Sequence, residues 1–87
     1  MYWMRKGKRD PLQYFSRYPG RFRMLHVKDM AADGSMVDVG AGNTDWKAIF
    51  HHARAAGVRH AFLEHDEPKD ALAFARGGYD YLKRLRY

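Results

Sequence analysis

The chain has 87 residues, enough for one small domain and too few for a second. Hydrophobic residues make up 46% of the sequence and aromatic residues 15%, which is ample for a globular core and argues against a disordered chain. The absence of cysteine excludes disulfides and thiolate metal sites, and it fits a reducing cytoplasm. No apolar run is long enough to cross a bilayer, and residues 1–9 lack the apolar segment of a secretion signal. We therefore expect a soluble, cytoplasmic protein without a membrane segment.

The charge balance is basic, with 16 Lys and Arg against 10 Asp and Glu and a net charge of +6. Such a balance suits an anionic partner, for example a phosphorylated sugar or nucleic acid. Cations gather at residues 5–9 and 83–86, but elsewhere they are scattered singly. Scatter of this kind is typical of exposed helix faces, so we do not expect nucleic acid to be the main partner.

The first half of the chain predicts a helix, a strand and a long loop. Asp10-Pro11 is a helix start and Pro19-Gly20 a helix end, and the apolar run from Phe22 to Val27 indicates a strand. Residues 28–44 lack helical periodicity, so we expect a loop with a turn at Asp33-Gly34 and a brief extended segment at 36–39.

The second half predicts a helix, a strand and a last helix. Apolar residues recur at helical spacing from Trp46 to Ala53, with Asn43 or Thr44 as the expected cap and Gly57 as the end. A strand over residues 58–63 and a helix over 70–84 follow, the latter with an expected kink or frayed turn at Gly77-Gly78. We expect the last helix to place Leu72, Phe74, Ala75, Tyr79, Leu82 and Leu85 on one apolar side.

The order helix, strand, helix, strand, helix predicts an α/β fold with two parallel strands. Both strands are apolar at consecutive positions, as in a parallel sheet that is covered on both faces. Two strands cannot form such a sheet alone, because both edges stay open. We therefore expect residues 1–87 to be a single partial domain of a larger α/β protein, or to associate with copies of the same chain.

Functional side chains follow both predicted strands. His26, Lys28 and Asp29 stand at the end of the first strand and Glu64 at the end of the second, where parallel folds gather catalytic and ligand groups. Imidazole and carboxylate are suitable ligands for divalent metals. In the structural alternative, His26 caps a strand, Asp29 opens a turn, and Glu64 forms a salt bridge to a cation such as Arg59 or Lys28.

Other polar residues give weaker signals. The sequence Gly40-x-Gly42 before a helix suggests an anion-binding turn, but it lacks the further residues of either nucleotide fingerprint, so we exclude both. The run His65-Asp66-Glu67 is interpreted as loop, and His51 and His52 as surface or core histidines.

Four segments together resemble the C-terminal part of the sugar phosphate isomerase/epimerase family, within the xylose isomerase-like TIM barrel superfamily. They are residues 14–22 with Tyr-Pro-Gly-Arg-Phe, 25–30 with Leu-His-Val-Lys-Asp-Met, 37–46 with Val-Asp-Val-Gly-x-Gly, and 62–68 with Phe-Leu-Glu-His-Asp-Glu-Pro. The resemblance implies that the chain is the C-terminal fragment of a (β/α)8 barrel carrying its last two strands. It also implies a divalent metal, Mn, Mg, Co or Zn, with His26 and Glu64 as ligands and Glu64 as a proton-transferring carboxylate.

On this basis we assign Glu64 and Lys28 as candidate catalytic residues and His26 and Glu64 as candidate metal ligands. The expected function is that of a metal-dependent sugar phosphate isomerase or epimerase, which moves a proton or hydride next to a sugar carbonyl. Family members carry a ligand aspartate just before the Tyr-Trp pair, whereas here Met1 precedes Tyr2. We therefore expect poor activity from this chain alone, without the N-terminal barrel part or self-association. The alternative is a small basic α/β module that binds nucleic acid or another polyanion.

Overall fold

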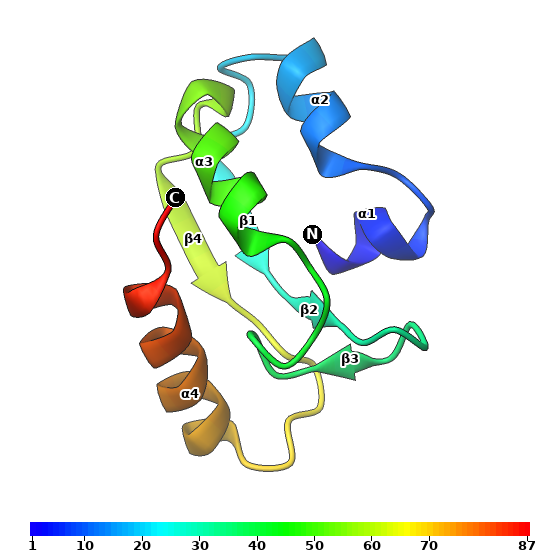
Figure 1. The fold of residues 1–87 in the computed structure, drawn as a ribbon, viewed down its shortest axis with the longest axis vertical. Helices are drawn as coiled ribbons and strands as arrows, with labels where there is room; N and C mark the ends of the chain where they lie inside the picture. The colour runs from blue at the N-terminus through cyan, green and yellow to red at the C-terminus, as the bar shows by residue number, and fades with distance from the viewer.

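A computed structural model describes all 87 residues, from Met1 to Tyr87. The chain forms four helices and two small sheets (Figure 1). In chain order the elements are α1 (Tyr2–Lys6), α2 (Pro11–Arg17), β1 (Met24–Val27), β2 (Asp29–Met30), β3 (Met36–Val37), α3 (Trp46–Ala56), β4 (His60–Leu63) and α4 (Ala71–Arg84). None of the four helices has the length and apolarity needed to span a membrane.

The predicted parallel pair is present. Strand β1 pairs with β4 in parallel, in a register that places Met24 beside His60 and Val27 beside Leu63. Two features add to the predicted order: α1, and an antiparallel pair formed by β2 and β3 within the expected loop. The turn predicted at Asp33-Gly34 joins these two strands, and Gly34 has a positive φ of 86°. The coarse α/β prediction is therefore confirmed, while this chain by itself shows no barrel.

Helix ends follow the local sequence. The carboxylate of Asp10 accepts a hydrogen bond from the Leu12 amide at 2.9 Å, and Pro11 takes the first helical position of α2 as predicted. Helix α3 is capped by Asp45, whose carboxylate accepts from the Ala48 amide at 2.9 Å. The expectation that Asn43 or Thr44 caps α3 is thus wrong.

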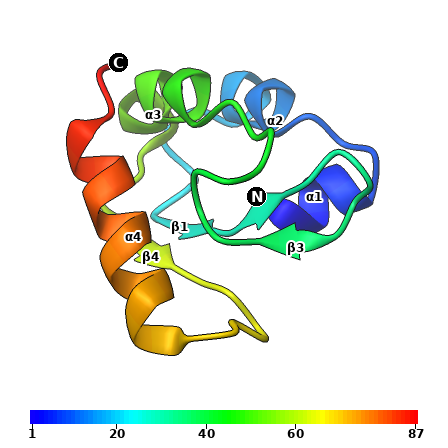
Figure 2. The ribbon, with the colours of Figure 1, turned by 60° about the horizontal axis from the view of Figure 1, so that its bottom comes forward.

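The core lies on one side of the parallel pair. Helices α2 and α3 lie over this side in Figure 2, and α4 runs beside β4. The side chains of Leu25 and Val27 point into this core, where Trp46 is its largest fully buried member. The core cluster contains Phe15, Leu25, Val27, Val39, Trp46, Ile49, Ala56 and Phe74.

The opposite side of the pair is open. Side chains of a strand alternate between faces, so Met24 and His26 share one face with the paired residues His60 and Phe62. Met24 is 60% exposed and Phe62 48% exposed. The sheet is therefore covered on one face only, whereas the consecutive apolar residues predict cover on both.

Helix α4 runs without interruption through its two glycines, so the expectation of a frayed turn there is wrong. A Cβ at Gly78 would lie 2.7 Å from both methyl groups of Leu63, so this glycine lets the helix pack closely on β4. A Cβ at Gly77 would meet nothing within 4 Å. The apolar side of α4 also differs from the prediction, because Leu72 is 83% and Tyr79 60% exposed.

The adjacent glycines give a matched test of this packing. Both Gly77→Ala and Gly78→Ala gain the same helix propensity, about 1 kcal/mol. We expect Gly77→Ala to stabilise the protein and Gly78→Ala to be less stable than it by about 1–3 kcal/mol, because the added methyl displaces Leu63. Urea unfolding followed by tryptophan fluorescence measures both values. Equal stability of the two variants would contradict the close contact between α4 and β4.

Candidate functional site

The carboxyl ends of β1 and β4 lie side by side because the two strands are parallel and in register. Alternation along each strand directs His26 and Lys28 to the face that also carries Glu64. Contacts join these three side chains and Asp66, and we call the four residues the strand-end cluster. The structure thus brings His26, Lys28 and Glu64 together, whereas Asp29, which also follows the first strand, lies outside the cluster.

The His26 ring and the Glu64 carboxylate are in direct contact. His26 Nδ1 donates to Glu64 Oε2, and the backbone amide of Glu64 donates to the Val27 carbonyl at 3.0 Å, which ties the Glu64 backbone to the end of β1. A neutral His26 that donates through Nδ1 leaves the lone pair of Nε2 free. The His26 side chain is 64% exposed, so this nitrogen is available to a metal or a substrate proton.

Lys28 is buried at the centre of the strand-end cluster. Its Nζ donates to Glu64 Oε1 at 3.0 Å and to Asp66 Oδ1. The ammonium also lies 5.0 Å from the ring centre of Trp3 and 5.7 Å from that of Tyr2, so α1 covers it with aromatic faces. Burial by itself lowers the pKa of Lys28, but the hydrogen bonds to Asp66 and Glu64 outweigh it and raise the pKa above its ordinary value.

Glu64 uses both carboxylate oxygens within the cluster. Hydrogen bonds from His26 and then Lys28 lower the pKa of Glu64 to about 2. A carboxylate of such low basicity is a poor proton acceptor near neutral pH. In this arrangement the ionised Glu64 carboxylate orients the His26 ring and the Lys28 ammonium. The salt bridge to Lys28 also matches the structural alternative from the sequence.

Asp66 is the member of the cluster that the sequence interpretation misses. It follows β4 in a loop, and its backbone amide lies 3.2 Å from Met36 Sδ on β3. The preceding side chain, His65, accepts from the Glu67 amide at 3.1 Å and packs edge-on against Phe74. Spacing carries a weak signal for Asp66, because residues 64 and 66 of an extended segment point the same way.

Asp29 has a structural role in this fold. Its carboxylate is fully buried and accepts from five N–H groups at 2.8–3.3 Å, namely the amides of Met30, Gly40, Gly42 and Thr44 and Nε1 of Trp46. Burial raises the pKa of Asp29, but the hydrogen bonds, led by Thr44 and Gly40, outweigh it and leave the pKa below its ordinary value.

The glycine turn at Gly40 and Gly42, which resembles a phosphate-binding turn, therefore binds the carboxylate of Asp29 from the same chain. Its amides point at Asp29 and not at solvent. A Cβ at Gly42 would overlap Asp29 Oδ1 and the Met30 carbonyl, which explains why a residue without a side chain is needed there. The exclusion of a nucleotide site at this turn agrees with this geometry.

The cluster offers two of the donors that a metal centre needs. His26 and Glu64 have suitable chemistry and meet at one point, but Asp66 is held by Lys28, and no group of three His, Cys, Asp or Glu residues is arranged to hold a metal ion. His51 and His52 are exposed on α3, and their rings meet edge to face. A complete metal shell does not fit within these 87 residues.

No protein-family model matches the chain, and a search of curated proteins also finds no match. What His26, Lys28 and Glu64 can do is therefore judged from their positions and chemistry. The positions are specific: two parallel strands end in a contact between imidazole and carboxylate, with a buried ammonium beside it.

We expect Asp29→Asn to lower the free energy of unfolding by about 2–4 kcal/mol, because an amide group would face several N–H donors that the carboxylate now satisfies. Asp80→Asn, on the exposed side of α4, is the matched control and should change stability by less than about 0.5 kcal/mol. Denaturant unfolding measures both variants. Equal effects would show that the buried carboxylate is not an anchor.

The lowered pKa of Glu64 predicts how its contribution depends on pH. A carboxyl whose pKa falls from 4.5 to about 2 on folding stabilises the fold fully above pH 4.5 and loses this contribution as the pH falls toward 2. The stability difference between the natural chain and Glu64→Gln should therefore shrink over this range. Glu67→Gln, which removes a neighbouring carboxylate outside all ion pairs, is the control. A difference that is independent of pH would contradict the Glu64 contacts.

Proposed function

We propose that the chain is the C-terminal portion of a metal-dependent sugar phosphate isomerase or epimerase with a xylose isomerase-like TIM barrel. The observation that carries this proposal is the contact between His26 and Glu64 at the ends of adjacent parallel strands. Such convergence at the carboxyl ends of strands is where barrel enzymes hold their reacting groups. The resemblance of the four sequence segments supplies the family.

The open face of the sheet supports an origin in a larger barrel. Met24 and Phe62 are exposed on the face that also carries His26 and Glu64, and this face would be the interior of a closed barrel. Both edges of the two-stranded sheet lack a neighbouring strand. Further strands at these edges would bury the apolar residues and surround the polar ones.

In the proposed enzyme the chain supplies two metal ligands and the group that keeps one of them ionised. A divalent cation, Mn, Mg, Co or Zn, would polarise the oxygen atoms of a sugar or sugar phosphate. Metal ligands bind in their deprotonated form, and the Lys28 ammonium favours the ionised form of Glu64. Lys28 thereby acts on the site through Glu64. The remaining ligands and a second acid/base group belong to the rest of the barrel.

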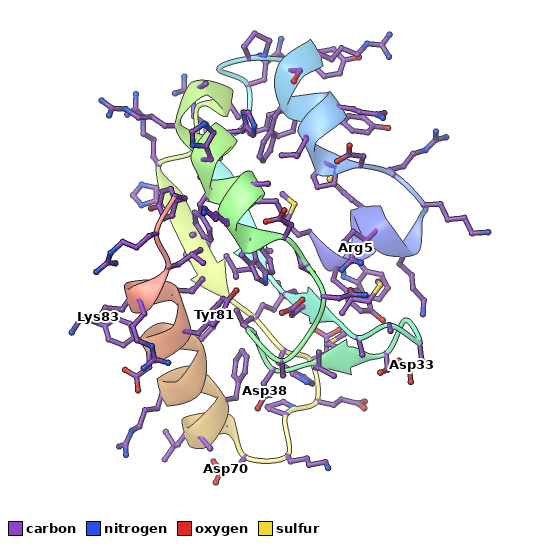
Figure 3. All side chains as sticks on the ribbon, in the orientation of Figure 1. Arg5, Asp33, Asp38, Asp70, Tyr81 and Lys83 are labelled. Atoms are coloured by element: carbon purple, nitrogen blue, oxygen red, sulfur yellow. The ribbon has the colours of Figure 1, made fainter.

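The alternative, a basic module that binds a polyanion, lacks a supporting surface. Arg5 and Lys83 lie at opposite sides of the molecule in Figure 3, so the two basic clusters do not form one patch. Arg5 donates to the Thr44 hydroxyl at 2.7 Å and to the side-chain oxygen Oδ1 of Asn43 at 2.8 Å. Arg5 therefore has a structural role, and nothing in the structure favours binding of a polyanion.

Metal titration of the chain tests the proposal directly. We expect Mn²⁺ to broaden the NMR signals of His26 and Glu64 before other signals, because Nε2 of the exposed His26 ring is free and the Glu64 carboxylate contacts the same ring. Binding should be weak, since most of the coordination shell is absent. His26→Ala and Glu64→Gln should each abolish the local broadening, whereas His52→Ala on α3 should preserve it.

Complementation tests the activity. The chain would be mixed with a fragment that supplies the first six strands of a family barrel, and sugar epimerisation would be measured with and without metal. We expect turnover that requires metal and is lost in Glu64→Gln. Absence of both turnover and local Mn²⁺ broadening would overturn the proposed function.

A further inference from the structure

A groove of about 450 Å³ lies away from the strand-end cluster, between the N-terminal helices and the start of α3. None of the four cluster residues lines it. Its apolar part comes from α2 and α3, where Pro11 and Ile49 are buried. Its volume is in the range of sites for small molecules, roughly 300–1,000 Å³.

The polar wall of this groove carries two arginines, of which one is hydrogen-bonded within the chain and the other is not. Arg5 is held in place by its bonds to Asn43 and Thr44, both of which line the groove. Arg9 belongs to none of the four ion pairs of the chain and donates no side-chain hydrogen bond. Of the two arginines, Arg9 therefore has its guanidinium free for a ligand, and the planar N–H groups of a guanidinium match a carboxylate.

Two carboxylates limit the charge of the ligand. Asp10 and Asp45 also line the groove, and each uses one oxygen to cap a helix. Beside them a dianion such as phosphate would meet two negative charges, whereas a monoanion can face Arg9 with less repulsion. The apolar residues between the charges favour a ligand that has an apolar body.

We propose that this groove binds a small monocarboxylate with an apolar body, with Arg9 contacting the carboxylate and the α2–α3 floor contacting the body. The site is separate from the proposed isomerase site and shares no residue with it. The proposal for this groove can therefore be tested independently of His26 and Glu64.

Benzoate is the probe, and amide NMR shifts of Thr44, Ala48 and Ile49 are the measurement. We expect saturable shifts at these amides. Arg9→Gln should weaken binding about threefold to fivefold, as expected for an exposed charge pair. Arg17→Gln removes the same charge elsewhere on the surface and should leave the affinity unchanged. Ala48→Leu should block binding by filling the groove, and His26→Ala should have no effect.

Two further probes decide the ligand class. Benzamide has nearly the same shape without the charge, and inorganic phosphate has charge without an apolar body; both should bind more weakly than benzoate. Benzamide binding equal to that of benzoate would overturn the role of Arg9, and tighter binding of phosphate would overturn the preference for a monoanion. Shifts that do not saturate, or equal weakening by Arg17→Gln, would show that the groove is not a site.

Discussion

The fold depends on one buried carboxylate. Asp29 begins β2, separated from the end of β1 by one residue. Its five N–H donors are the amides of Met30, Gly40, Gly42 and Thr44 and the indole of Trp46 at the start of α3. A fully buried charge is tolerable only when its hydrogen-bonding capacity is met, and here the donors are backbone amides and one indole. The carboxylate thus organises a loop that has little regular structure of its own.

This anchor also sets the direction of its neighbours. Successive side chains of an extended segment point to opposite sides. Because Asp29 points into the core, Lys28 points to the opposite face, where it is buried against Glu64 and Asp66. His26, two residues earlier, lies on the same side as Lys28 and meets Glu64. A one-residue slip in the register of this segment would move each side chain to the opposite face. Asp29 would then leave its N–H donors, and His26 and Lys28 would leave the strand-end cluster. The fold and the candidate site are therefore consequences of one alternation.

The sequence predicts those parts of the site that depend on local pattern. Apolar runs that end in polar residues locate His26 and Glu64, and the parallel order of elements implies that the two strand ends meet. The partners of Asp29 are not predictable in this way, because its donors lie up to 17 residues further along the chain. The glycine turn gives a signal for anion binding, but local sequence does not reveal that the anion is a side chain of the same chain.

Sequence analysis does not predict that α1 and Asp66 contribute to the strand-end cluster, for a related reason. Helix α1 has five residues and no apolar period that could be detected, and its role arises only when Tyr2 and Trp3 lie against Lys28. Asp66 looks like a loop residue until the buried ammonium of Lys28 draws it into the cluster. In both cases the contact with the buried Lys28 ammonium joins residues that are far apart in the sequence. Such contacts leave no periodic pattern from which they could be predicted.

One face of the parallel sheet is buried under helices, and the other face is largely exposed. On the helix side the core is closed, with Leu25 and Val27 buried and Gly78 allowing α4 to reach Leu63. On the other side Met24 and Phe62 remain exposed next to the strand-end cluster. All the reactive side chains lie on this unfinished side, where apolar neighbours would raise the strength of their electrostatic contacts by excluding water. The chemistry of the cluster is therefore tied to whatever covers that face, and burial of Met24 and Phe62 would change the properties of His26 and Glu64 at the same time.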